Sequence, residues 1–565
     1  MKETIVHAIN NAILDLGIEG VDFVVEHPAE LTHGDYASNV ALVVSSQLGK
    51  APRQVAEELQ AALLGTIDHV ESIDVAGPGF LNFHLQRDFF IEKITHINEV
   101  GEEWGKAVTH HGEVVLFEYT SPNLFKPLHV GNLVGNIIGE SLSRLFEYNG
   151  AEVRRINYPS DIGLTVAKGV WGLRETGGDP ADINALGEAY RFGNEAYETD
   201  EAKKAEIIAV NQALYAGNDA ALNKLRDEGL STSKQRLLGI CASLGTAFDP
   251  DGTIYESDAA PRGVAIVKDN TPKVFEESEG AVIYRGEKVG LHTRVFLNSK
   301  ELPTYEAKDL GNFVIKQERF PHWHTSIVVT GNEQAEYFKV VYAVIKELYP
   351  ELEKSGKSLE HVPTGFLTLT TGKMSSRKGN ILSGEQVLEE LEAEAKKRSS
   401  VEEGEHEEGR SLASKVATAA IKYQILRHSI GSSIIFDKQK ALSFEGDSGP
   451  YLQYTHARIC SVLTKAATAG VAPTADAAPA NPYDLERLIY QFPEVIEVAL
   501  RERAPHKVVT FLTELASEYN TFYAQEKIAD SSDGNAPYKV ALTQAVGKTL
   551  KNGLLVLGIE APEKM

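Results

Sequence analysis

The segment 113–158 constrains the fold of this chain more than any other part of the sequence. Residues 113–119 (EVVLFEY) and 152–158 (EVRRINY) are short apolar runs that predict two buried strands, and Gly150 ends a helical pattern between them. That helical pattern is carried by Leu133, Ile137, Ile138, Leu142, Leu145 and Phe146. A strand, a helix and a strand in this order predict two parallel strands joined by a right-handed crossover.

A second unit of the same kind begins at residues 325–330 (TSIVVT), which predict another strand. The helix after it has an apolar face made of Phe338, Val341, Ile345 and Leu348. Two such units predict a doubly wound α/β domain, and ligands of that fold bind at the carboxyl ends of the strands.

The loop after the first strand carries the pattern His129-x-Gly131-Asn132 where a helix begins. Helix N-termini attract anions through their unpaired N–H groups and the helix dipole, and a glycine lets a phosphate approach the backbone. Taken alone, the pattern is more typical of a strand-to-helix turn with a surface histidine.

A second loop, 372–379 (GKMSSRKG), places three cations and two hydroxyls between glycines, after the strand-like run FLTLT. Such a loop can fold over a triphosphate and supply positive charge to a leaving pyrophosphate. The alternative for this loop alone is a solvated basic turn.

The two loops together resemble the signature pair of class I aminoacyl-tRNA synthetases, H-x-G-[HN] early in a parallel sheet and K-M-S-[KS] late in it. The residues around the signatures resemble the arginyl family: EYTSPN (118–123), KPLHVG (126–131) and KMSSRKGN (373–380). Further stretches similar to that family are HGDYASNVAL (33–42), AGPGFLNF (76–83), FEG with GPYLQYTHAR (444–458) and the terminal run LLVLGIEAPEKM.

The resemblance implies a multidomain α/β chain. Residues 1–108 would form a small α+β N-terminal domain that binds the tRNA elbow. Residues 109–405 would form a Rossmann-type parallel-sheet catalytic domain with a helical insertion at about 175–260. Residues 406–565 would form an all-α anticodon-binding domain, since the acidic, glycine-broken segment 402–410 predicts a boundary.

Arginine presents a planar guanidinium that carboxylate, tyrosine and amide oxygens match well. The family resemblance places the arginine-binding residues at Glu118, Asn123, Tyr305, Asp309 and Gln334. Tyr305 and Asp309 are four residues apart and share a helix face. The alternatives are a core tyrosine beside a surface aspartate, and plain capping roles for Glu118 and Gln334.

The resemblance also implies the ATP-binding residues: His129, Gly131, Asn132, Lys373, Met374, Ser375 and Ser376. Ser376 stands where class I loops usually have a second lysine, so one transition-state cation is missing. Either Lys126 or Lys378 would replace it, and the catalytic set is then His129, Lys126, Lys373, Ser375 and Lys378. Mg²⁺ is expected on the phosphates, and similar enzymes need bound tRNA even for the first step.

The resemblance implies L-arginine, ATP and cognate arginine tRNA as partners. It places the tRNA-binding residues at Phe80, Asn82, Tyr454, His456 and Arg458. The net charge of −24 argues weakly against a nucleic-acid partner, although a local basic stripe on an acidic body is compatible with one. No stretch is apolar for long enough to span a membrane, and two isolated cysteines fit a reducing compartment. We therefore expect a cytoplasmic protein, and a monomer.

Three positions depart from the family pattern. Asn132 replaces a histidine, Ile162 replaces a tryptophan in the segment Ser160–Gly163, and Lys308 replaces an arginine. Two other functions stay open on the sequence alone: a non-enzymatic tRNA-binding relative, and a class I synthetase for another amino acid. A cysteinyl enzyme would need zinc-ligand cysteines, which Cys241 and Cys460 cannot supply.

Overall fold

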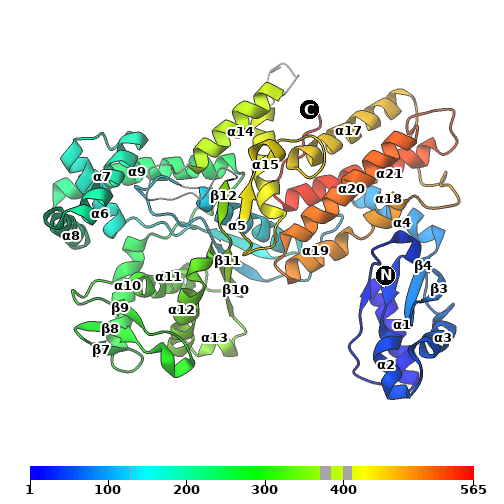
Figure 1. The fold of residues 1–565 in the computed structure, drawn as a ribbon, viewed down its shortest axis with the longest axis horizontal. Helices are drawn as coiled ribbons and strands as arrows, with labels where there is room; N and C mark the ends of the chain where they lie inside the picture. Colours follow the sequence, from blue (N-terminus) through cyan, green and yellow to red (C-terminus); the bar gives the residue numbers. More distant parts are fainter. Residues whose placement is uncertain (129, 370–382, 399–409) are drawn as a thin grey trace.

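The computed structural model describes residues 1–128, 130–369, 383–398 and 410–565. A central parallel sheet separates two lobes of the middle region, and the N-terminal domain and the C-terminal helices lie at the other end of the molecule (Figure 1). His129, the predicted phosphate loop with Lys373, Met374, Ser375, Ser376 and Lys378, and most of the acidic boundary segment lie outside the described residues.

The central sheet has the strand order β11-β10-β5-β6, and all of its strands are parallel. The strands are β5 (Val114–Glu118), β6 (Glu152–Ile156), β10 (Thr325–Gly331) and β11 (Ser358–Thr364). Helix α5 (Val130–Tyr148) connects β5 to β6, and α12 (Ala335–Leu348) connects β10 to β11. The predicted doubly wound fold is therefore confirmed, and the strand order reverses between β5 and β10.

Both faces of the sheet are covered, which explains why its two central strands, β5 and β10, are mainly apolar rather than alternating. Val115 and Phe117 of β5 belong to the core that α5 and the C-terminal helices share. Leu116 between them belongs to the core on the opposite face, beside α11 (Tyr305–Arg319) and α12. Successive residues of one strand thus stabilise two separate layers.

Four helices form a bundle with its own core, on the left in Figure 1. They are α6 (Leu164–Thr176), α7 (Ile183–Thr199), α8 (Glu201–Ala216) and α9 (Ala220–Ser243), and we refer to them as the helical insertion. Below it lie α10 (Glu256–Asp269), α11 and a small antiparallel sheet of β7 (Glu276–Ser278), β8 (Ala281–Tyr284) and β9 (Arg294–Leu297).

The N-terminal domain is a four-stranded antiparallel sheet with helices on one face. Its elements are α1 (Lys2–Asp15), β1 (Val25–Glu26), β2 (Tyr36–Ser38), α2 (Val40–Leu48), α3 (Pro52–Leu63), β3 (Val70–Ala76) and β4 (Phe80–Leu85). Helix α4 (Arg87–Val100) leads from it to the central parallel sheet.

The C-terminal part is helical, as predicted. Its main helices are α15 (Leu412–Leu426), α17 (Gly449–Thr468), α18 (Asp484–Ile489), α19 (Phe492–Arg501), α20 (Pro505–Gln525) and α21 (Ala536–Val556). Short strands β12 (Leu367–Leu369) and β13 (Ile434–Phe436) pair in parallel, and α13 (Glu351–Lys354), α14 (Gly384–Arg398) and α16 (Lys438–Ala441) complete the chain. Helix α17 runs on to Thr468, and the Ala/Pro-rich stretch that follows it leads to α18.

Ion pairs and a hydrogen bond join the N-terminal domain and α4 to the C-terminal helices. Arg487 lies 2.6 Å from Asp35, and Arg87 lies 2.6 Å from Glu486; both carboxylates are fully buried. Tyr36 donates a hydrogen bond of 2.6 Å to Glu494. Breaking one partner of such buried pairs is strongly destabilising, so the two regions hold a fixed relative position. None of the helices that the structure describes is long and apolar enough to cross a membrane.

Candidate active site

A cavity of about 520 Å³ opens at the carboxyl ends of β5, β10 and β11, beside the N-terminus of α5. This is the position that the strand order predicts for a ligand site. Five residues predicted from the sequence line it: Asn123, Lys126, Gly131, Asn132 and Gln334. The structure thus brings together residues from both strand–helix units, more than 200 positions apart in the chain.

The α5 side of the cavity is suited to an anion. The helix begins at Val130, so its free N–H groups and dipole lie at the cavity. Gly131 and Gly135 line the cavity next to Lys126, and the space where a Cβ of Gly135 would stand is open. A phosphate can therefore approach the backbone, with a lysine beside it.

A second group of polar residues surrounds Asp309 on α11. The hydroxyl of Tyr337 donates a hydrogen bond of 2.5 Å to the Asp309 carboxylate. Burial raises the pKa of Asp309 and the nearby carboxylate of Glu118 raises it further, to about 7, although Tyr337 and Lys316 act in the opposite direction. A cationic ligand beside Asp309 would stabilise its carboxylate and so oppose this shift, which means that the site favours a guanidinium or ammonium group.

Glu118, at the end of β5, is already paired inside the protein. The ammonium of Lys316 lies 2.5 Å from its carboxylate, both side chains are nearly fully buried, and Asn312 donates a hydrogen bond of 2.9 Å. Its negative charge is therefore largely compensated before any ligand arrives. Asp309 has no such ion pair in the part of the chain that the structure describes, so it is the better placed acceptor for a guanidinium.

Sequence reasoning missed four residues around these acids: Tyr158, Asn312, Lys316 and Tyr337. Among the described residues, neither the buried Tyr158 hydroxyl nor the Asn312 carbonyl oxygen has a hydrogen-bond partner. Burial raises the pKa of the Tyr158 hydroxyl, and the negative charge of Asp309 raises it further, so this hydroxyl lies close to that carboxylate. Unpaired polar atoms in such a place indicate that a ligand completes their hydrogen bonds.

Tyr305 is more than half exposed at the start of α11, with the ammonium of Lys308 5.0 Å from its ring centre. Lys308, the position where the family has arginine, is buried and lies 2.5 Å from Glu256. The lysine keeps the positive charge that an arginine would have at this position, and the Glu256 carboxylate compensates it. Asp161 accepts hydrogen bonds from the backbone and hydroxyl of Ser257 at the start of α10, so the altered segment around Ile162 has a structural partner there.

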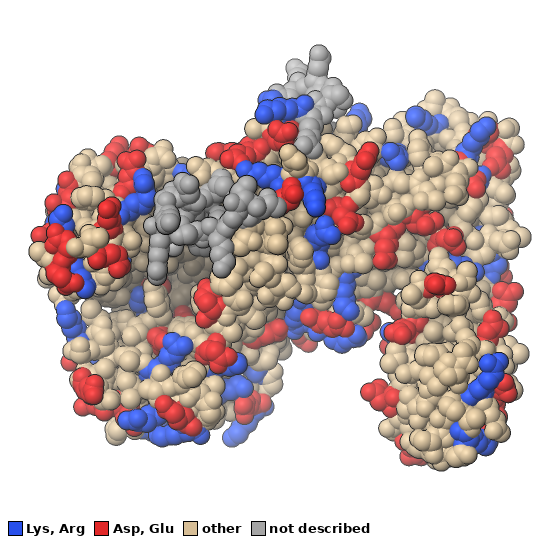
Figure 2. Space-filling view, in the orientation of Figure 1, with Lys and Arg blue, Asp and Glu red and all other residues tan. Residues whose placement is uncertain are grey.

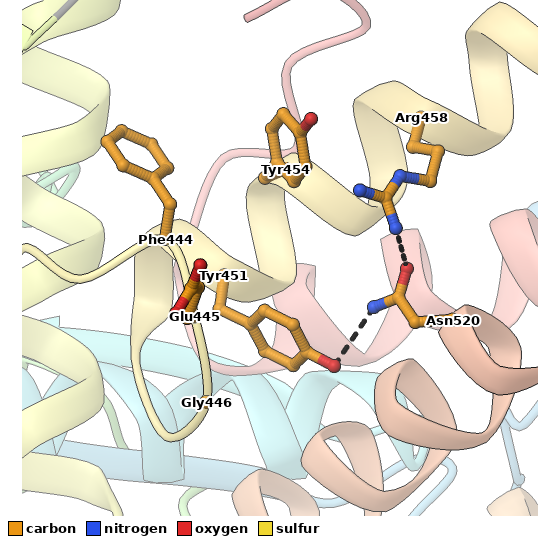
Figure 3. Close-up of a pocket in the computed structure, with 7 residues that line it drawn as sticks. All are labelled: Phe444, Glu445, Gly446, Tyr451, Tyr454, Arg458 and Asn520. Carbon is orange, nitrogen blue, oxygen red and sulfur yellow. Dashed lines mark hydrogen bonds between the residues drawn. The ribbon is translucent and has the colours of Figure 1, made fainter. Parts of the chain in front are cut away.

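A separate pocket of about 420 Å³ lies between α17 and α20 (Figure 3). It is lined by Phe444, Glu445, Gly446, Tyr451, Tyr454, Arg458 and Asn520. The guanidinium of Arg458 lies 4.9 Å from the centre of the Tyr454 ring and 5.1 Å from that of Tyr523. An exposed aromatic ring beside an arginine is typical of a site for an unstacked base.

The other predicted tRNA residues are not all at a surface. His456 is buried on α17 and bonded to the carbonyl of Pro562 at 3.0 Å, so it holds the C-terminal segment rather than facing the pocket. In the N-terminal domain, Phe80, Asn82 and His84 share the face of β4 opposite its core residues. Phe80 is exposed there, whereas Asn82 is buried.

Comparison with known proteins agrees with this architecture in every region. Residues 93–438 match the family described as "tRNA synthetases class I (R), catalytic domain". Residues 452–565 match the "DALR anticodon binding domain", and residues 1–85 match the "Arginyl tRNA synthetase N terminal domain".

Similar proteins cover the whole chain. Arginine--tRNA ligase 2 of Bacillus anthracis is 29% identical over 551 residues, which cover 96% of this chain and 95% of that protein. Arginine--tRNA ligase of Halorubrum lacusprofundi is 29% identical and covers 100% of this chain and 99% of its own length. The solved structure of Thermus thermophilus arginyl-tRNA synthetase has a TM-score of 0.80 at 26% identity, with both chains covered in full.

The parallel sheet, with its nucleotide-type cavity at the strand ends and a separate helical domain, defines a class I aminoacyl-tRNA synthetase, which uses ATP. Within that class the chain belongs to the arginyl-tRNA synthetases, and its activity is that of an arginine--tRNA ligase.

Proposed function

We propose that arginine binds between Asp309 and the cavity, with its guanidinium on the Asp309 carboxylate. The observation that carries this proposal is the uncompensated acid at Asp309, beside the unpaired Tyr158 hydroxyl and Asn312 oxygen. Asn123 and Gln334 line the cavity and can hold the amino-acid end, and Tyr305 can cover the site from α11. Glu118 then orients Lys316 and Asn312 and contributes to the ligand through them.

In the first step, a carboxylate oxygen of arginine attacks the α-phosphorus of ATP, and pyrophosphate leaves. The tRNA then provides the 2′-hydroxyl of its terminal adenosine, which attacks the carbonyl carbon of the adenylate, and AMP leaves. Catalysis of this kind depends on positioning and on charge stabilisation. The α5 N-terminus and Gly131 would hold the phosphates, together with His129, Asn132, Lys373, Met374, Ser375 and Ser376.

Lys126 is our candidate for the cation that the signature loop lacks at Ser376. It lines the cavity between Asn123 and the start of α5, on the side suited to phosphate. A cation used in the transition state lowers the barrier without tightening substrate binding. Lys126→Ala should therefore reduce kcat by about 10²–10³ with little change in KM for ATP. A near-normal kcat in Lys126→Ala with a collapse in Lys378→Ala would assign the role to Lys378.

Mg²⁺ fits the cavity as a partner of the phosphates rather than of a protein cage. Glu333 is the one carboxylate among the described residues that line it. Mg²⁺ commonly binds through one or two carboxylates together with substrate phosphates, and there it neutralises developing negative charge.

The pocket of Tyr454 and Arg458 and the β4 face with Phe80 would contact the tRNA at two distant points. Acidic and basic side chains are interspersed on the face of the molecule shown in Figure 2. Stacking on aromatic rings then contributes more than a long basic groove. We also propose that the enzyme works as a cytoplasmic monomer.

The decisive measurement is arginine-dependent ATP–pyrophosphate exchange, with and without cognate tRNA. We expect exchange with arginine and tRNA together, and none with lysine. Exchange with a different amino acid, or none with cognate tRNA, would overturn the proposal.

A further inference from the structure

The helical insertion holds the loop that carries Lys126 by packing around the side chain of Phe125, the residue immediately before it. Phe125 is 98% removed from solvent and belongs to the core of α6, α7, α8 and α9, not to the core under the sheet. Its backbone has φ 69°, a left-handed conformation that is costly for a residue with a side chain. Such a conformation persists only where the surroundings determine it.

The insertion has a recess that matches the Phe125 ring. A Cβ at Gly169 of α6 would stand 2.6 Å from the ring, and a Cβ at Gly229 of α9 would stand 2.5 Å from it. Both helices therefore have glycine where the ring enters. In addition, the hydroxyl of Ser233 on α9 accepts a hydrogen bond of 3.2 Å from the Phe125 backbone N–H.

The residues on either side of Phe125 are held as well. Leu124 is buried against Leu237 and Cys241 of α9, and its N–H donates 3.0 Å to the carbonyl of Ser160. Pro127 faces α7, where a Cβ at Gly187 would stand 3.3 Å from its ring. Lys126 thus stands between two residues that are anchored in the insertion, while its own position lines the cavity.

We propose that Phe125 is a positioning residue, through which the helical insertion sets the place of Lys126 against the phosphates of ATP. The inference rests on the proposed role of Lys126. The insertion then does more than fill space beside the sheet, because the packing of α6 and α9 fixes a cation in the active site. A displacement of about 1 Å in such a group can reduce a rate by about 10²-fold.

The first test uses two glycines of the same helix. Gly229→Ala places a methyl group against the Phe125 ring, whereas Gly239→Ala places one in open space. Both changes favour the helix, because alanine has the higher helix propensity. We expect kcat for arginine-dependent exchange to fall about 10- to 100-fold in Gly229→Ala, with KM for arginine within about twofold of the wild type. Gly239→Ala should keep both constants within about twofold. Equal kcat values in the two variants would overturn the inference.

The second test asks whether Phe125 acts through Lys126, and uses Phe125→Ala, Lys126→Ala and the double variant. If Phe125 works by placing Lys126, Phe125→Ala reduces kcat in the wild type but adds less than about twofold in the Lys126→Ala background. Independent, multiplying effects would overturn the inference. Should the melting curve show that Phe125→Ala unfolds the insertion, Phe125→Leu takes its place in the cycle.

The outcomes separate the inference from the proposed function. Absence of arginine-dependent exchange in the wild type would refute the proposed function itself. An active wild type with a normal kcat in Lys126→Ala would instead refute the role of Lys126, and the positioning inference with it. As a core control, Ile207→Ala truncates a fully buried residue of the same bundle on α8, away from the loop. A fall in its kcat as large as that of Phe125→Ala would show a general loss of packing, which also overturns the inference.

Discussion

The affinity for arginine should follow the ionisation of Asp309. Its carboxyl group has a pKa of about 7 because it is buried and lies near Glu118. A guanidinium binds the carboxylate and not the protonated acid, so the binding-competent fraction falls as the pH falls through 7. At pH 6 about a tenth of the sites are ionised, and at pH 8.5 nearly all are. The apparent KM for arginine should therefore be about tenfold higher at pH 6 than at pH 8.5.

Two variants sharpen this prediction because they alter the pKa of Asp309 without removing the acid. Tyr337 and Lys316 both stabilise the carboxylate, the first by a hydrogen bond and the second by its charge. Tyr337→Phe should therefore shift the pH profile of KM to higher pH. Lys316→Gln should shift it in the same direction, since it also leaves Glu118 uncompensated.

The assay is steady-state aminoacylation at saturating ATP and tRNA, with arginine varied at half-unit steps from pH 6 to 8.5. Isothermal titration at pH 7 in two buffers of different ionisation enthalpy would show about half a proton released for each arginine bound. A KM that is flat across this range, together with no proton release, would refute the reasoning. A profile that Tyr337→Phe leaves unmoved would refute the assignment to Asp309.

Three further outcomes follow from the same residues. Asp309→Asn should raise KM for arginine by far more than threefold, because an uncompensated cation in a buried site costs about 3–5 kcal/mol; a change within threefold would contradict the assignment. In the ligand-free protein, Asp309→Asn should raise the free energy of unfolding above pH 7 by at most about 4 kcal/mol, because the raised pKa of the Asp309 carboxyl destabilises the folded wild type there. The gain in melting temperature should disappear as the pH falls towards 4. Phe80→Ala should weaken tRNA binding by about 1–3 kcal/mol and leave KM for ATP unchanged. Leu64→Ala truncates another exposed apolar side chain of the same domain and should change neither quantity. Equal losses of tRNA affinity in the two variants would argue against a tRNA contact at β4.

The features that the sequence predicts best are those with a local signal. Strand β5, helix α5 and strand β6 are encoded by apolar runs and helical spacing within a single short segment, so their existence and order are readable in advance. The position of the cavity also follows from the strand order, whereas the assignment of Lys126, Gly131 and Gln334 to it rests on the family resemblance.

Pairings between distant segments have no local signal. Glu118 and Lys316 are almost 200 residues apart, and no pattern in either segment indicates that they meet. Tyr337 likewise reaches Asp309 from a different helix. The burial of His456, by contrast, could have been predicted. Tyr454 and Arg458 are four residues apart and share a helix face, whereas a residue halfway between them points to another face.

The proposed arginine site combines features that each reduce stability in the absence of ligand. The Asp309 carboxyl is largely removed from solvent with no ion-pair partner among the described residues, and the nearby Tyr158 hydroxyl and Asn312 oxygen have no described partner either. A buried acid and unpaired polar atoms are retained where function requires them, and neighbouring structure compensates for them. Here the compensation is visible, because Lys316 neutralises Glu118 and Glu256 neutralises Lys308. The proposed site thus keeps one carboxylate without an ion-pair partner among the described residues, and a bound arginine would stabilise the fold by supplying the missing cation.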